Sequence, residues 1–94
     1  MADFMMAMSI NQNAKKTHEA ISREINDSFD LFNQKGVKMT KLYATLGRYD
    51  FVAVFEASDQ SQAFKIASEI NSRGILDTET WPIIPYEDFT KLLS

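Results

Sequence analysis

Four side chains in this sequence have types and spacing that could support chemistry: Tyr43, Thr45, Asp50 and the single histidine, His18. Tyr43 and Thr45 are two positions apart, so in a strand both side chains point to the same side. Asp50 follows a turn, and in a hairpin it would return opposite Thr45. A phenol, a hydroxyl and a carboxylate at the rim of an apolar floor would bind a small hydrophobic molecule. The same carboxylate could act as a general base.

Each of these side chains also has a structural interpretation. The Asp50 carboxylate can accept from Thr45 or from backbone N–H groups and so fix the turn, as aspartates at turns commonly do. Tyr43 can pack in an interface, with its hydroxyl bonded to a partner. His18 can be a half-buried helical side chain, which makes it a secondary candidate for the site. For Tyr49, we expect packing against the helices.

The turn that positions the site residues is the stretch LGRYD, residues 46–50, between VKMTKLYAT and FVAVFEA. A two-residue loop made of Gly47 and Arg48 would fit a type II′ turn, in which the glycine has positive φ. The register that follows from this loop has two sides. One side pairs Leu46 with Tyr49, Ala44 with Phe51, Leu42 with Ala53, and Thr40 with Phe55. The other pairs Thr45 with Asp50, Tyr43 with Val52, Lys41 with Val54, and Met39 with Glu56.

The elements that carry this hairpin follow from hydrophobic periodicity. Strands are expected at 3–10, 37–46, 49–57 and 75–84. A first helix is expected from Ala14, capped by Asn11 or Asn13, with apolar positions three and four residues apart. A second helix begins at the D-x-x-Q pattern of Asp59 and Gln62. The glycines at 36 and 74 end these two helices, and a short third helix begins at Pro85.

The order βαββαβ predicts a ferredoxin-like α+β sandwich, with a four-stranded antiparallel sheet and both long helices on one face. Two helices cover only one face of such a sheet. The other face would then expose the apolar side chains of Met39, Tyr43, Val52 and Val54. A large exposed apolar patch usually marks an interface, and C2 homodimers are the commonest oligomers. The sequence therefore predicts a homodimer, or a higher oligomer, joined through this face.

The segment LYATLGRYDFVAVFEASDQSQAFKIA resembles the central part of the GYD domain family. The residues that carry the resemblance are Thr45, Gly47, Tyr49, Asp50, Glu56, Ala57 and Asp59. The likeness extends from the first strand to about Trp81. It implies a fold of the dimeric α/β-barrel group and supports the dimer. It implies no particular activity.

Length and composition restrict the remaining possibilities. The 94 residues form one domain, 1–94. A net charge of −3 with scattered basic residues argues against nucleic-acid binding. The absence of cysteine fits a cytoplasmic protein, and no apolar run is long enough for a membrane span. We found no metal-ligand spacing, phosphate loop or dinucleotide motif, so no metal and no cofactor are expected.

Two functions remain open on the sequence alone. The first is a homo-oligomeric ligand-binding or assembly module, in which Tyr43, Thr45, Asp50 and His18 form the candidate ligand site. The alternative is a cofactor-independent oxygenase or isomerase that acts on a small hydrophobic molecule. A closed apolar cavity with converging polar groups would favour the enzyme, and a filled interface would favour assembly. Whether the protein is an enzyme is therefore left undecided at this point.

Overall fold

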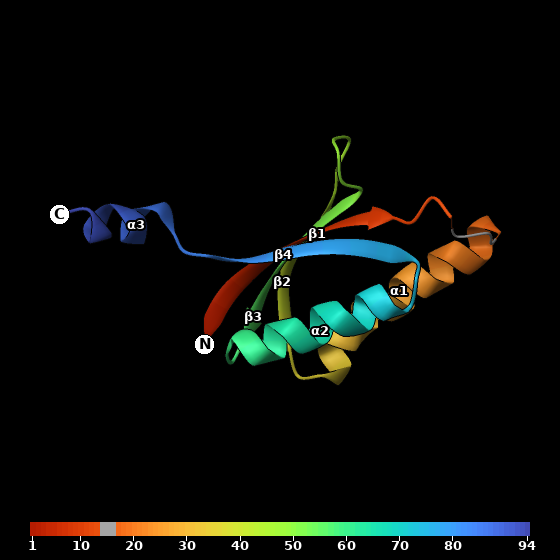
Figure 1. Cartoon of the computed structure of the whole chain (residues 1–94), viewed down its shortest axis with the longest axis horizontal. Helices are drawn as coiled ribbons and strands as arrows, with labels where there is room; N and C mark the ends of the chain where they lie inside the picture. Colours follow the sequence, from red (N-terminus) through yellow and green to blue (C-terminus); the bar gives the residue numbers. More distant parts are fainter. Residues whose placement is uncertain (14–16) are drawn as a thin grey trace.

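The computed structural model describes residues 1–13 and 17–94, and these carry seven elements of secondary structure (Figure 1). In chain order they are β1 (Ala2–Ile10), α1 (His18–Gln34), β2 (Lys38–Ala44), β3 (Phe51–Ala57), α2 (Gln60–Ser72), β4 (Leu76–Ile83) and α3 (Tyr86–Leu92).

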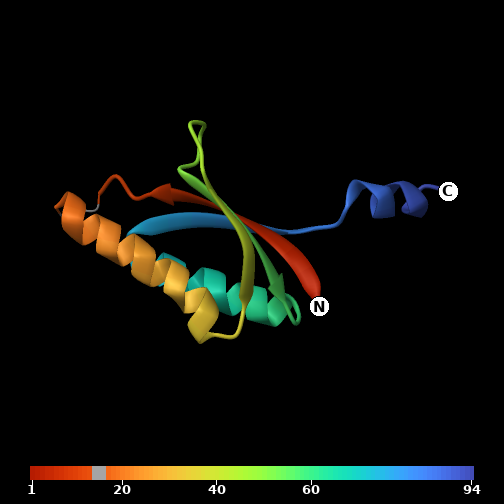
Figure 2. The ribbon, with the colours of Figure 1, turned by 180° about the vertical axis from the view of Figure 1, so that it is seen from behind.

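The four strands form one antiparallel sheet in the order β2-β3-β1-β4. Helices α1 and α2 both lie against the same face of this sheet, as Figures 1 and 2 show from opposite sides. The α3 helix lies beyond the end of β4, away from the other elements. This α+β arrangement is compatible with the predicted ferredoxin-like fold.

The hydrophobic core fills the space between the sheet and the two long helices. Along β1 the alternate side chains Phe4, Met6 and Met8 point into it and are at most 3% exposed. The Phe55 ring of β3 stacks on Phe4 at 5.6 Å and meets Phe32 of α1 edge-on at 5.2 Å. Each fully buried large side chain contributes about 1.5–3 kcal/mol relative to exposure. Because of this alternation, one face of the sheet packs in the core and the other face points away from it.

The first helix begins later than the sequence predicted. Thr17 is its N-cap, and the Thr17 hydroxyl accepts from the backbone N–H of Ala20 at 3.1 Å. The predicted cap at Asn11 or Asn13 is wrong, because the Asn11 side chain instead accepts from the backbone N–H of Asn13 and forms a local turn. The predicted start at Ala14 lies outside the described residues.

The predicted start of α2 and the predicted ends of both long helices are confirmed, whereas the short helix predicted from Pro85 begins at Tyr86, with Pro85 as its N-cap. Asp59 caps α2 by accepting from the backbone N–H of Gln62 at 2.9 Å, and the Gln62 side chain accepts in return from the N–H of Ser58. Gly36 and Gly74 follow α1 and α2 with φ of 71° and 76°. At these two positions a side chain would be strained, which explains why glycine ends both helices.

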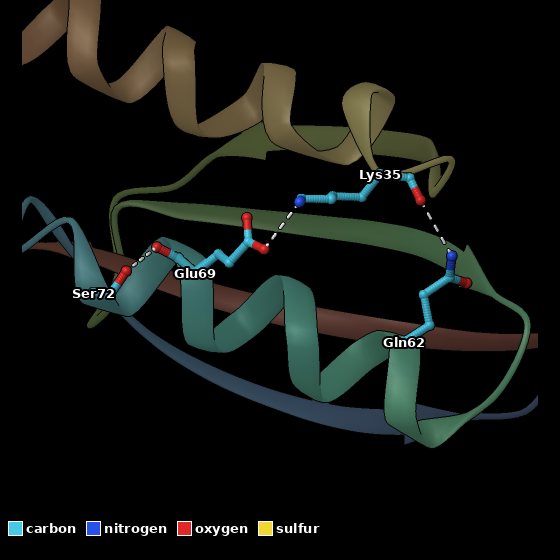
Figure 3. A network of polar contacts seen from close by, with 4 residues as sticks. All are labelled: Lys35, Gln62, Glu69 and Ser72. Carbon is cyan, nitrogen blue, oxygen red and sulfur yellow. Dashed lines mark hydrogen bonds and ion pairs between the residues drawn. The ribbon is translucent and has the colours of Figure 1, made fainter.

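A polar network joins the end of α1 to the outer side of α2 (Figure 3). The Lys35 ammonium lies 3.1 Å from the Glu69 carboxylate, and the Lys35 carbonyl accepts from the Gln62 side chain at 3.3 Å. The Ser72 hydroxyl donates to the Glu69 carbonyl one turn further along α2. These contacts link the two helices at their exposed edges.

The β2–β3 hairpin is not closed by a two-residue turn. Strand β2 ends at Ala44 and β3 begins at Phe51. Among the described residues only Gly36 and Gly74 have positive φ, so Gly47 does not have the conformation that the turn requires. The predicted type II′ turn at Gly47 and Arg48 is therefore wrong. Thr45 and Asp50 still face each other, because the Thr45 backbone N–H donates to the Asp50 carbonyl at 2.9 Å. The Thr45 hydroxyl also donates to the Tyr49 carbonyl, so side-chain as well as backbone hydrogen bonds close the loop, and no glycine with positive φ is needed.

The register of the hairpin is confirmed over its central part and shifts beyond it. Lys41, Leu42, Tyr43 and Ala44 have the predicted partners, but Met39 lies opposite Phe55 and not opposite Glu56. Thr40 is left without a partner at this irregularity, and its hydroxyl donates to the Val54 carbonyl. Such a bulge moves the following side chains to the other face. Met39 accordingly packs against the core, which corrects its predicted place on the opposite face.

Candidate functional site

The face of the sheet that points away from α1 and α2 is the first candidate for a functional surface, and we call it the open face. Cross-strand pairing places its side chains in two rows. One row runs Lys41, Val54, Met5, Trp81, and the next runs Tyr43, Val52, Ala7, Glu79. Apolar groups occupy the middle of both rows. Among the described elements, neither helix of the core layer covers this face (Figures 1 and 2).

Aromatic side chains lie at the two edges of the open face. Tyr43 on β2 is 54% exposed and Trp81 on β4 is 39% exposed. Between them, Met5, Val52 and Val54 are only partly buried. Tyrosine and tryptophan in such positions are typical anchors of protein–protein interfaces. The open face thus combines an apolar middle with aromatic edges, and Lys41 and Glu79 lie at its margins.

Tyr49 and Glu79 form a hydrogen bond across the open face, with the Tyr49 hydroxyl as donor and the Glu79 carboxylate as acceptor. Because β1 lies between β3 and β4, this contact bridges β1 close to Ala7, which pairs with Glu79 and is 2% exposed. The hydrogen bond to Glu79 raises the pKa of Tyr49 above its usual value, with smaller contributions from desolvation and the Glu79 charge. The predicted packing of Tyr49 against the helices is thus wrong.

The Asp50 carboxylate accepts from the backbone N–H of Ile10 at 2.8 Å. Nearby, the backbone N–H of Thr45 donates to the Asp50 carbonyl at 2.9 Å, and the Thr45 hydroxyl donates to the Tyr49 carbonyl. Asp50 therefore links the hairpin to β1, in agreement with the structural interpretation of this residue. Its carboxylate keeps lone pairs that point to solvent, since the residue is exposed.

The structure brings together three of the four predicted site residues. Thr45 and Asp50 are hydrogen-bonded neighbours, and Tyr43, near the end of β2, lies two positions before Thr45. His18 is separate from them, because it is the exposed first residue of α1 in the helix layer. Tyr43 points to the opposite face of the sheet. The ligand site proposed for these residues can therefore include Tyr43, Thr45 and Asp50 without His18 in a single chain.

A second feature is a groove between α2 and β4, which we call the edge groove, with a volume of about 380 Å³. Its lining is uncharged and includes Phe4, Ala63, Phe64, Thr80, Trp81 and Pro82. Phe64 is 69% exposed, although it projects from a helix whose other face is buried. The Thr80 hydroxyl is buried with no hydrogen-bond partner within the described part of the chain. The groove thus has an apolar lining and an unused polar group.

Sequence reasoning missed Glu79 and the edge groove. The alternation of residues 77–81, DTETW, was a usable signal, because it puts Asp77, Glu79 and Trp81 on one face and the threonines on the other. The groove had no local signal, since it depends on how α2 lies against β4. In the described ranges no group of three or more His, Asp or Glu side chains is placed to hold a metal ion. No helix there is long and apolar enough to cross a membrane.

Comparison with known proteins gives two matches. The sequence model of the GYD domain family matches residues 4–93. A protein of Thermus thermophilus, named glutamine synthetase and cystathionine beta-lyase binding protein, is 38% identical over 66 residues. That match covers 70% of this chain and 67% of the Thermus protein.

Proposed function

Because this chain belongs to the GYD domain family, we propose that it is a homodimeric assembly module that pairs through its open face and binds other proteins. In the dimer, two open faces stack to give the dimeric α/β barrel implied by the family resemblance. Sheets packed face to face lie about 10 Å apart and interdigitate their inner side chains. A cytoplasmic location belongs to the same proposal.

The observation that carries this proposal is the uncovered row of Val54, Met5 and Trp81 on the open face. These side chains span three neighbouring strands and have no helix over them. A contiguous apolar surface of this kind is costly in water, and a second copy removes it for both chains at once. The marginal Lys41 and Glu79 can then lie at a polar rim, as in other interfaces.

The protein partners are proposed from the similar Thermus protein, whose name states that it binds glutamine synthetase and cystathionine beta-lyase. For this chain we expect binding to enzymes of these two kinds. The projecting loop between β2 and β3 is a suitable contact point, because Leu46 at its tip is fully exposed. It lies on the side of the sheet away from α1 and α2 (Figure 2).

Partner binding can be measured directly by immobilising this protein and titrating purified glutamine synthetase and cystathionine beta-lyase from the same organism. We expect saturable binding of at least one enzyme, weakened several-fold by Leu46→Glu. Ser22→Glu, at an exposed position of α1, adds the same charge and serves as the control. Absence of binding to both enzymes would contradict this part of the proposal.

The alternative activity, a cofactor-independent oxygenase or isomerase, would need polar groups that converge in a closed apolar cavity. In one chain the candidates are Tyr43, Thr45 and Asp50, and the Tyr49–Glu79 pair lies across the same face. The Asp50 carboxylate already accepts from Ile10 N–H, which favours a structural role. A screen of small hydrophobic fragments by NMR would test the site. Shifts centred on Tyr43 and Asp50 would favour a ligand, and shifts only at the outer helical surface would end that hypothesis.

A further inference from the structure

Residues 84–93 form an arm that extends from the end of β4 and carries α3 (Figures 1 and 2). Every large apolar side chain of the arm is exposed, from 46% at Phe89 to 74% at Tyr86 and Leu92. Helix α3 has no buried residue. Tyr86, Phe89 and Leu93 follow one another at spacings of three and four, so they share one side of the helix. The arm therefore presents an apolar side that nothing within the described chain covers.

An isolated helix of this length is not stable in water. Helices shorter than about 12–15 residues are marginal even with favourable sequences, and their stability in proteins comes from packing. Helix α3 has seven residues, and its N-cap residue, Pro85, provides no side-chain hydrogen bond to the first turn. Its acidic residues Glu87 and Asp88 lie in the first turn and Lys91 in the last, which suits the helix dipole but contributes only tenths of a kcal/mol. The arm needs a surface to pack on.

The edge groove offers a surface of matching character. It is uncharged, it is lined along α2 from Gln60 to Asn71, and it has a volume of about 380 Å³. At 1.5 Å per residue this stretch of α2 is roughly 18 Å long, whereas α3 is roughly 10 Å long. The exposed Phe64 ring can pack against an aromatic side chain of the arm.

The arm does not fold back into the groove of its own chain. The groove ends at Trp81 and Pro82, immediately before the arm, so a return would need a full reversal of direction near Ile84. Ile84 precedes Pro85, and a residue before proline is kept out of the helical region. Pro85 itself is extended, with φ −58° and ψ 146°. The two prolines therefore direct the arm away from the domain.

From these observations we propose that α3 of one chain packs into the edge groove of a second copy of the same chain. The inference rests on the proposed self-association, which supplies the second copy. A two-fold axis that places one arm in one groove places the other arm as well. Counting both surfaces of both contacts, the exchange buries on the order of 1,500 Å² by typical side-chain areas. That is the area of a stable interface.

The test uses the absence of cysteine from the natural chain. Ser68→Cys places a thiol in the groove at an exposed, nearly isosteric position, and Leu92→Cys places one on the arm. The two single variants are mixed, allowed to exchange subunits, and treated with a short bismaleimide. We expect a covalent species of about twice 10.7 kDa that contains one chain of each kind. As a matched control, Leu46→Cys at the loop tip replaces Ser68→Cys, and this mixture should give little cross-linked heterodimer.

Two results would overturn the inference. In the first, the mixture of single variants gives no heterodimer, and a double variant, Ser68→Cys with Leu92→Cys, cross-links only within one chain. This result would show that the arm folds back onto its own groove. The absence of any cross-link in both experiments would show that the arm packs elsewhere. Either result, together with a wild-type dimer that Val54→Glu dissociates, would leave the proposed open-face dimer intact. A cross-linked heterodimer together with a Val54→Glu variant that stays dimeric would contradict pairing through the open face and would support the exchange of arms.

Discussion

At the scale of single residues, Asp50 shows how a candidate catalytic side chain can have a structural task. Its carboxylate accepts from Ile10 and its backbone N–H donates to Met8, so both groups join the hairpin to β1. The sequence predicted correctly that Thr45 lies opposite Asp50, because a hairpin brings together the residues on either side of its loop. It could not reveal the bonds to β1, because those partners lie about 40 residues away in the chain.

We therefore predict that Asp50→Ala lowers the free energy of unfolding by about 1 kcal/mol. A hydrogen bond to a charged group contributes roughly 1.5–3 kcal/mol, and exposure to solvent reduces that value here. Urea denaturation followed by circular dichroism measures the change. Asp27→Ala, at an exposed position of α1, should not lower stability. If Asp50→Ala leaves stability unchanged, the structural account of Asp50 is wrong.

The Tyr49–Glu79 contact gives a prediction about pH. The pKa of Tyr49 is raised above 10, mainly by its hydrogen bond to Glu79. A folded-state pKa above the unfolded value means that the contribution to stability is present at neutral pH and disappears as the pH rises through the raised pKa. The free energy of unfolding should therefore fall as Tyr49 ionises at alkaline pH.

The measurement is tyrosinate absorbance as a function of pH. The titration step of Tyr49 should disappear in Tyr49→Phe and should move to lower pH in Glu79→Ala. Tyr86→Phe, on the arm, removes a tyrosine that does not contact Glu79 and is the control. An unchanged Tyr49 titration in Glu79→Ala would show that the hydrogen bond does not control this pKa.

At the scale of elements, the positions of all four strands, of α2 and of α3 were predictable from the sequence. Hydrophobic alternation, the Asp59 cap and the glycines after α1 and α2 are local signals that act within a few residues. The loop at 45–50 and the bulge at Thr40 were not predictable in the same way. Both depend on how β2 and β3 meet β1, which is a property of the assembled sheet. The direction in which the arm leaves the sheet was not predictable either, although its helix was predicted.

The glycines allow a matched test at this scale. Gly36 has positive φ, whereas Gly47 does not, and neither would bring a Cβ within 4 Å of another atom. Gly36→Ala should therefore cost about 1–2 kcal/mol of stability from backbone strain alone. Gly47→Ala should be close to neutral. The midpoints of thermal unfolding compare the two, and a Gly47→Ala variant as destabilised as Gly36→Ala would contradict the loop geometry.

At the scale of the whole molecule, two surfaces are left uncovered in the single chain. One is the open face, with Tyr43 and Trp81 at its edges, and the other is the apolar side of the arm. The molecule measures 52 Å along its longest axis and 28 Å along the next, an elongation to which the arm contributes (Figure 1). The proposed second copy of the chain would cover both surfaces. The homodimer is thus the central claim of this account.

The most direct test of that claim is the molar mass in solution, measured by light scattering over a dilution series of the wild type and of Val54→Glu. Val54 lies in the middle of the open face, directly opposite Lys41 on β2, so a single folded chain can pair the new carboxylate with that ammonium. A stacked sheet would bury the same charge at the dimer interface, where it is costly. We predict a wild-type mass of about twice 10.7 kDa or a higher multiple, and a folded Val54→Glu chain close to 10.7 kDa, while Ser22→Glu keeps the wild-type mass. A wild type that stays at 10.7 kDa throughout the series, or a Val54→Glu variant that keeps the wild-type mass, would contradict the claim.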